Sequence, residues 1–192
     1  MTRLHLVRHG PTHAKSMVGW SDLPADLSDT AALARLSAHL PQSGVVISSD
    51  LSRATATADA IQGDRTRLPH QPGLREINFG AWELRNFCEI EAETPELIRA
   101  YWEHPGDVRP PGGESWNEVC DRVNDAIDTL ITAHTGQDLI IVAHFGAILT
   151  QVQRAEALDS EQAFSHRIDN LSVTQLTLGP DGWSTGHINH LA

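Results

Sequence analysis

The sequence predicts one α/β domain that spans residues 1–192, with a mainly parallel central sheet flanked by helices and a small helical or loop insert near its functional site. Three observations predict this class. Short runs rich in Val, Ile and Leu are typical of strands that are buried on both faces, as in parallel sheets. Segments with apolar residues at helical spacing alternate with these runs. A length of 192 residues suits one domain with a sizeable core.

The first strand is expected at residues 3–7, where a mostly apolar run ends in a turn that contains glycine. Runs rich in β-branched residues predict two more strands, at 44–48 and 139–143. A last strand is expected at 173–178, where apolar and hydroxyl residues alternate.

Helices are expected in four segments: residues 31–40, 52–61, 115–133 and 147–154. In the third segment Val119, Val123 and Ile127 share one helical face, which predicts packing against the sheet. Residues 86–113 are less regular, with four prolines and the pair Gly112-Gly113. We expect a partly helical insert there, close to the loops that follow the strands, where open α/β sheets bind their ligands.

Composition excludes several classes of protein. The formal net charge is -11 and the 14 Lys and Arg residues form no run, which argues against a nucleic-acid partner. No apolar stretch is long enough for a signal peptide or a membrane span, so we expect a cytoplasmic protein without a membrane partner. Cys88 and Cys120 lack metal-ligand spacing and are expected to be buried free thiols. The sequence assigns no oligomeric state.

Charged and polar residues follow three of the apolar runs. Arg8 and His9 follow the first run, and His144 follows the third. Arg53 comes shortly after the second. If these strands are parallel neighbours, two arginines and two histidines meet at one end of the sheet. Arginine forks match phosphate oxygens, and a neutral histidine is a nucleophile for phosphorus, so the pattern indicates a phosphate site.

The tripeptide Arg8-His9-Gly10 opens a series of ordered blocks that span most of the chain. The blocks are residues 6–12, 19–22 with 27–28, 48–54 with 57–58, 74–83, 111–115 and 142–144. This series resembles the histidine phosphatase (phosphoglycerate-mutase-like) superfamily. One short match would carry little weight, whereas several in the same order carry much more.

The resemblance implies a role for each matched residue. His9 corresponds to the nucleophile that takes the phosphoryl group, and Glu76 to the proton donor. Arg8, Arg53 and His144 correspond to the phosphate pocket, where cationic groups stabilise the transition state. We expect partial burial and the nearby phosphate to raise the pKa of Glu76.

Seven residues are predicted to bind the substrate: Thr12, Lys15, Gly19, Trp20, Trp82, Glu83 and Phe145. Glu83 is also a rival acid, and for Glu83 and Glu114 a role as loop anchor or arginine partner is equally open. Lys15 stands where the family usually has asparagine, and Phe145 and Leu84 stand where it commonly has glycine. These departures leave the catalytic set intact and put the substrate in question.

We therefore expect a phosphatase that hydrolyses a small phosphorylated metabolite through a phosphohistidine on His9. The chain resembles the α-ribazole-phosphate phosphatases, and broad-specificity phosphatases share those features. No cofactor is implied, and no metal is expected because Arg8 and Arg53 would repel a divalent cation. The alternatives are phosphoryl transfer of the cofactor-dependent phosphoglycerate-mutase type and a non-catalytic module that binds or regulates through a phosphorylated ligand.

Overall fold

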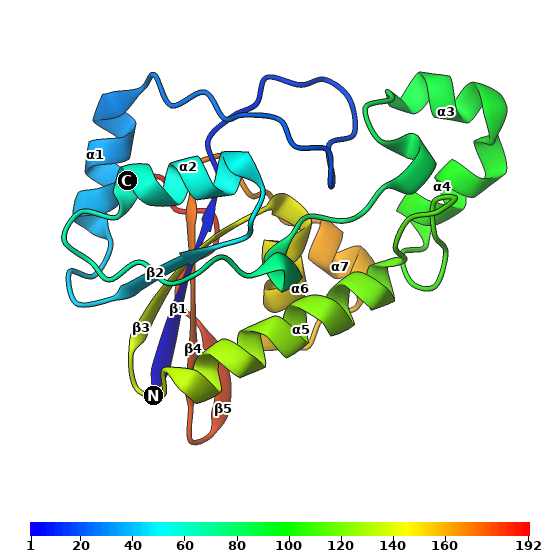
Figure 1. Ribbon diagram of the computed structural model, residues 1–192. Coiled ribbons are helices and arrows are strands. Elements are labelled where there is room, and N and C mark those ends of the chain that lie inside the picture. Colours follow the sequence, from blue (N-terminus) through cyan, green and yellow to red (C-terminus); the bar gives the residue numbers. More distant parts are fainter.

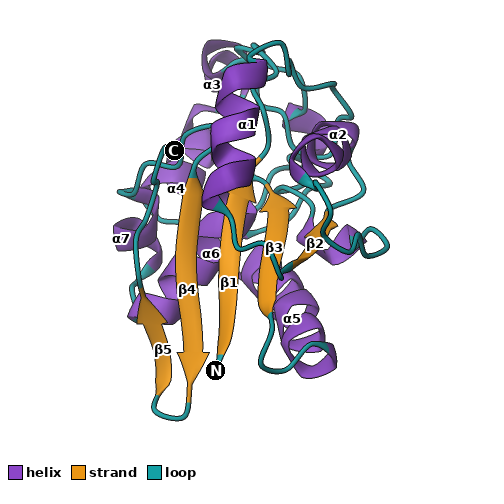
Figure 2. Ribbon diagram, turned by 90° about the vertical axis from the view of Figure 1, so that its left-hand side faces the viewer, coloured by secondary structure: helices purple, strands orange, loops and turns teal.

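A five-stranded sheet forms the centre of the computed structural model, which describes residues 1–192 (Figures 1 and 2). Its strands are β1 (Thr2–Arg8), β2 (Val45–Ser48), β3 (Asp138–Ala143), β4 (Val173–Gly179) and β5 (Gly182–Thr185). The spatial order is β2-β3-β1-β4-β5. The predicted parallel arrangement holds for the central β2, β3 and β1, whereas β4 and β5 run antiparallel. The short β5 was not predicted.

Helices cover both faces of this sheet. On one face lie α1 (Thr30–His39) and α2 (Ser52–Ile61), and on the other α5 (Trp116–Ala133) and α6 (Phe145–Glu156) (Figures 1 and 2). Each face of the sheet has its own hydrophobic core, and alternate residues of β3 belong to one core or the other. Ile141 belongs to the core under α5 and α6, and Ile140 belongs to the core under α1 and α2. Burial on both faces explains why this strand is apolar throughout.

The longest helix, α5, begins at a capping box. The Ser115 hydroxyl accepts a hydrogen bond from the Glu118 amide at 3.3 Å, and the Glu118 carboxylate accepts one from the Ser115 amide at 2.8 Å. These bonds satisfy amide groups that the first turn of a helix leaves free. The predicted apolar stripe is buried, including Val119, Val123 and Ile127. The cap therefore fixes the helix end that lies beside residues 111–114.

The predicted insert contains two helices, α3 (Phe87–Glu93) and α4 (Pro95–Glu103), at the right of Figure 1. A further short helix, α7 (Ser160–Phe164), was not predicted, because five residues are too few for a helical period to appear. Two short 3₁₀ turns, Pro72–Leu74 and Gly80–Trp82, flank Glu76. Both cysteines are free thiols as expected, but the prediction that both are buried is wrong, because Cys88 is exposed and Cys120 is half-buried. None of the helices combines the length and apolar character needed to cross a membrane.

Candidate functional site

Parallel pairing brings the predicted strand-end residues together. Arg8 pairs with Ala143 in the β1–β3 register, so His9 and His144 follow at neighbouring positions. Their rings lie 5.0 Å apart, centre to centre. Arg53, in the first turn of α2 after β2, donates from Nε to His9 Nε2 at 3.2 Å. The expected cluster of two arginines and two histidines therefore exists at one end of the sheet.

His9 is held in one tautomer. Its Nδ1 lies 2.6 Å from the Gly10 carbonyl oxygen, which only accepts hydrogen bonds, so Nδ1 carries the proton. Nε2 is then unprotonated, and the N–H of Arg53 points to its lone pair. Burial, reinforced by Arg53 and Arg8, lowers the pKa of His9 to about 3. The side chain is 6% exposed, so a neutral, largely desolvated imidazole presents Nε2 as a nucleophile.

Arg53 is oriented by two backbone carbonyl groups. Its two terminal nitrogens donate to Ser21 O at 2.9 Å and to Gly19 O at 2.6 Å. With Nε directed at His9, the guanidinium is fixed on three sides, and the residue is 1% exposed. Such a fixed, desolvated fork is suited to a phosphate group, because little side-chain entropy remains to be lost on binding.

Glu83 fixes the loop that supplies those carbonyl groups. Its carboxylate accepts from the amides of Gly19, Trp20 and Ser21 at 3.1, 2.7 and 3.2 Å, and from the Ser21 hydroxyl at 2.6 Å. The Phe79 amide adds a fifth bond at 3.1 Å. A side chain at Gly19 would place Cβ only 2.4 Å from Glu83 Oε1. Glu83 is thus a loop anchor, and a contact between its side chain and the substrate stays a prediction.

Arg8 and His144 each keep a buried nitrogen without a hydrogen-bond partner in the protein. Arg8 donates from its terminal Nη1 to Ile168 O at 2.6 Å, while its Nε is unpaired. His144 Nε2 lies 2.6 Å from Ser49 Oγ, and its Nδ1 is unpaired. Ser49 Oγ accepts from the Leu51 amide at 3.4 Å, and His144 Nε2 is the one acceptor that its hydroxyl proton meets, so the hydroxyl donates to Nε2. Nδ1 then carries a proton that it can donate to an anion.

Glu76 lies beside the same cluster, and its side chain contacts the start of α6. Its Oε1 accepts from the Ile77 and Gly146 amides at 3.0 and 2.9 Å, and Oε2 makes no hydrogen bond. Burial raises the pKa of Glu76, against the opposing effect of these amides and of the two arginines. This direction of the pKa shift agrees with the part of the expectation that rests on burial. A buried carboxyl group with a raised pKa and one free oxygen is suited to donating a proton.

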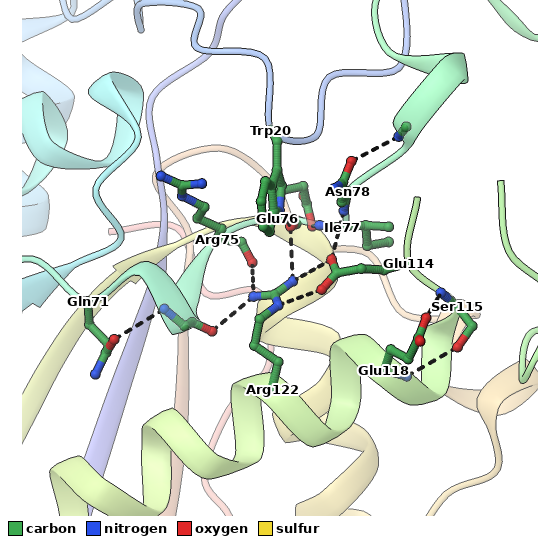
Figure 3. Close-up of polar contacts among 12 residues, drawn as sticks. Trp20, Gln71, Arg75, Glu76, Ile77, Asn78, Glu114, Ser115, Glu118 and Arg122 are labelled. Carbon is green, nitrogen blue, oxygen red and sulfur yellow. Dashed lines mark hydrogen bonds and ion pairs between the residues drawn. The ribbon is translucent and has the colours of Figure 1, made fainter. Parts of the chain in front are cut away.

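The backbone around Glu76 is held by Arg122 of α5 (Figure 3). The guanidinium donates to Gly73 O, Arg75 O and Glu76 O at 2.9, 3.0 and 3.2 Å. It also forms an ion pair with Glu114 at 2.7 Å, and Glu114 accepts from the Asn78 amide at 2.9 Å. Glu114 is therefore both an arginine partner and a loop anchor. Sequence reasoning missed Arg122, which lies outside the matched blocks.

A cavity of about 250 Å³ opens onto these groups. Of the predicted site residues, six line it: Arg8, His9, Thr12, Arg53, Glu76 and Phe145. His144 is fully buried beside His9. Six further lining residues were not predicted: Ala14, Ser16, Met17, Val18, Phe79 and Trp102. Trp102 comes from α4, so the insert does lie next to the site, and no spacing in the sequence singled this residue out.

Four predicted substrate-binding residues other than Glu83 do not line this cavity. Gly19 contributes its backbone to the loop that holds Arg53. Trp20 donates from its indole to Glu76 O at 2.8 Å, and the Arg75 guanidinium lies 4.7 Å from its ring centre. Trp82 is buried in the core against Tyr101. Lys15 is exposed, on the loop between the lining residues Ala14 and Ser16.

A second, larger cavity of about 410 Å³ lies between α1 and the C-terminal residues. Its lining includes Arg35, Leu36 and Leu191, and shares no residue with the cavity at His9. It lacks a histidine paired with converging arginines, so we assign the chemistry to the smaller cavity.

The sequence model of the "Histidine phosphatase superfamily (branch 1)" matches residues 4–190 of this chain. Among curated relatives, a bifunctional protein of Mycobacterium tuberculosis is 30% identical over 198 residues, which cover 96% of this chain and 52% of that protein. The chain thus spans about half the length of that relative. A probable phosphoglycerate mutase of Escherichia coli is 28% identical over 205 residues, covering 100% of this chain and 95% of that protein.

Solved structures show the same fold over the whole chain. YhfR of Bacillus stearothermophilus matches with a TM-score of 0.91 and 25% identity, covering 100% of this chain and 98% of that one. The α-ribazole phosphatase of Shigella flexneri matches with a TM-score of 0.87 and 26% identity, covering 99% of this chain and 97% of that one.

Proposed function

Because the chain belongs to the histidine phosphatase superfamily, we propose that it hydrolyses a small phosphomonoester through a phosphohistidine on His9, without a metal ion. One observation carries this proposal. The unprotonated Nε2 of a buried, neutral His9 lies among two arginines, a buried histidine and a carboxyl group with a raised pKa. That combination supplies a nucleophile, charge stabilisation and a proton donor for phosphoryl transfer.

In the first half-reaction, Arg8, Arg53 and His144 receive the phosphate oxygens of the ester. Nε2 of His9 attacks phosphorus, and the bond from phosphorus to the ester oxygen breaks. The electron pair of that bond leaves with the oxygen, and Glu76 donates the proton that converts the leaving alkoxide to an alcohol. Nδ1 keeps its proton and donates a hydrogen bond to the Gly10 carbonyl oxygen, which stabilises the positive charge that develops on the phosphorylated ring.

In the second half-reaction, a water molecule attacks the phosphohistidine. Glu76, now a carboxylate, takes a proton from that water while the P–N bond breaks and returns its electron pair to Nε2. Inorganic phosphate leaves, and Glu76 and His9 regain their starting protonation states. Each group therefore completes a cycle without an external cofactor.

The test is hydrolysis of an aryl phosphate by the purified protein in excess chelator, compared with the His9→Ala variant. We expect turnover that survives chelation and vanishes in the variant. An acid-labile phosphoryl label on the wild-type protein, absent from His9→Ala, would identify the intermediate. Turnover retained by His9→Ala would overturn the mechanism, and binding of phosphate or vanadate without turnover of any ester would favour a non-catalytic binding module.

A second candidate is phosphoryl transfer of the phosphoglycerate-mutase type. It is supported by the Escherichia coli relative named a probable phosphoglycerate mutase, which matches over 95% of its own length. A mutase returns the phosphoryl group to its organic substrate instead of to water, so it must protect the phosphohistidine from hydrolysis. Interconversion of phosphoglycerates faster than phosphate release would favour this candidate over hydrolysis.

An α-ribazole-phosphate-like ester is a narrower form of the first proposal. The support is the match to the Shigella flexneri α-ribazole phosphatase. A broad-specificity phosphatase fits the same data, and kcat/KM values across a panel of cellular esters would separate the two.

A further inference from the structure

The cavity at His9 changes character beyond its reacting groups. Its inner end holds Arg8, His9, Arg53 and Glu76, whereas its outer wall is made mostly of apolar side chains. Among these, Phe79, Trp102 and Phe145 present aromatic rings. The polar side-chain groups on the outer wall are the hydroxyls of Thr12 and Ser16 and the indole N–H of Trp102, and all three are uncharged.

The aromatic part of this wall is fixed by packing. Trp102 lies edge-on to Phe164 at 5.8 Å between ring centres, and Phe145 lies 6.5 Å from the same ring. Tyr101 braces Trp102 at 5.1 Å in another edge-on contact. Aromatic contacts of this geometry hold rings in place, so the wall is preformed and does not have to be ordered by a ligand.

The positively charged side chains of this protein are not available to the outer wall. Nine of its arginines form ion pairs with carboxylates outside the outer wall. Arg35 and Arg65 donate to backbone carbonyl groups away from the site. Arg8 and Arg53 serve the phosphate end, and the single lysine, Lys15, is exposed. A second anionic group on a ligand would therefore lose its water at an apolar wall without a fixed counter-charge.

We propose that the alcohol part of the substrate is uncharged and aromatic, and that Trp102 and Phe145 select it. This inference rests on the proposed phosphatase function. A planar ring would stack in the space between these side chains, and the neutral hydroxyls would serve a neutral polar group on it. Esters whose alcohol carries a carboxylate or a second phosphate would be disfavoured at the same site, because nothing on the outer wall balances that charge.

The test uses two esters that differ by one charge, benzyl phosphate and 4-carboxybenzyl phosphate, in excess chelator. We expect kcat/KM to favour benzyl phosphate on the order of 10- to 100-fold, because the carboxylate would be desolvated without a partner. Trp102→Arg should narrow or reverse this ratio by adding a cation to the wall. A gain in turnover of the carboxylated ester cannot arise from misfolding. The matched control is Ala133→Arg, which adds the same charge at an exposed position of α5 and should leave the ratio unchanged.

The outcomes separate this inference from the function on which it rests. Equal turnover of the two esters, or preference for the carboxylated one, would overturn the substrate class while the phosphatase function stands. A ratio that Trp102→Arg leaves unchanged would overturn the role of Trp102. If neither ester is hydrolysed and no other phosphomonoester is either, both the function and the inference fail.

Discussion

The inner and outer ends of the cavity at His9 are built from different parts of the chain. At the inner end, charged and polar side chains come from the end of β1, from residues directly after β1 and β3, from the first turn of α2 and from Glu76. All are buried except Arg8, which is half-buried. At the outer end, apolar side chains that are mostly half-buried come from the loop at residues 14–18, from α4 and from the start of α6, together with the buried Phe79. The inner end is fixed by the sheet, and the outer end by contacts among loops and the insert.

This difference separates the residues that act on phosphorus from the residues that select the ester. Parallel strands place their ends in register, so the groups that act on phosphorus are positioned by the same hydrogen bonds that make the sheet. The outer wall can vary without disturbing that register, because its residues are not part of any strand. Changes at the inner end should therefore alter rate strongly, and changes at the outer end should alter mainly the choice of ester.

After loss of the nucleophile itself in His9→Ala, the largest effect is expected from removing the proton donor. Glu76→Gln keeps an oxygen that can accept from the Ile77 and Gly146 amides but cannot donate a carboxyl proton. We expect kcat for an alkyl phosphate to fall on the order of 10²- to 10⁴-fold. An aryl phosphate, whose leaving group is less basic, should lose less.

The pH profile gives a second readout of the same variant. Because burial raises the pKa of Glu76, the protonated donor persists to higher pH than an ordinary carboxyl group, and activity is lost as pH rises through that pKa. His9, with its pKa near 3, stays unprotonated and imposes no limb between pH 4 and 9. The limb from Glu76 should disappear in Glu76→Gln, whereas ionisation of the ester remains. Identical profiles for the two proteins would contradict the assignment.

A smaller effect is expected from crowding Glu76. A Cβ at position 146 would lie 2.5 Å from Glu76 Oε1 and 2.8 Å from Ile77 Cγ1, so Gly146→Ala must displace the carboxyl group. We expect kcat to fall about 10- to 100-fold, because a shift of about 1 Å in a catalytic group has that scale of effect. Gly106→Ala is the matched control, since its Cβ would meet only His104 O at 4.0 Å. Unchanged kcat in Gly146→Ala would show that the position of Oε1 is not critical.

A still smaller loss of activity is expected when the loop anchor Glu83 is changed. Glu83→Gln replaces one acceptor oxygen by a donor that faces amide donors, so the loop loosens and its carbonyl groups no longer hold Arg53. We expect a loss of about tenfold in kcat/KM, the scale of one charge-assisted hydrogen bond. If Glu83 acts through Arg53, competitive inhibition by phosphate should weaken in parallel. Glu93→Gln, at an exposed ion pair of α3, should change neither quantity.

Most of the fold was predictable because its signals are local. The apolar runs of β1, β2 and β3 and the helical stripe of α5 report burial directly in their residue types. The antiparallel β4–β5 pair was missed although Pro180-Asp181-Gly182 at the junction of the two strands is typical of a tight turn, because the four residues of β5 are too few to show a strand period. The sequence also could not reveal α7, whose five residues span little more than one turn.

The inner site was predictable for a similar reason. Arg8, His9, Arg53 and His144 lie at strand ends or directly after a strand, so topology brings them together once the strands are parallel. The support around them was not predictable. Arg122 reaches Gly73, Arg75 and Glu76 across many residues of sequence, and Glu83 serves a loop more than sixty residues away. Such contacts leave no spacing for a sequence pattern to show.

The smallest effect is expected at Lys15, on the outer side of the site. Its side chain is exposed and makes no hydrogen bond or ion pair in the protein, so Lys15→Ala should change kcat/KM for benzyl phosphate by less than about threefold, the scale of a weak surface charge interaction. Steady-state kinetics at two ionic strengths would check this, since a long-range effect would fade with salt. A large loss confined to an ester with a second anionic group would mean that Lys15 turns into the cavity when such an ester binds. That result would give the outer end of the cavity the counter-charge that it lacks in the free protein. The contrast between the two ends of the cavity would then hold only for the free protein and for esters without a second anionic group.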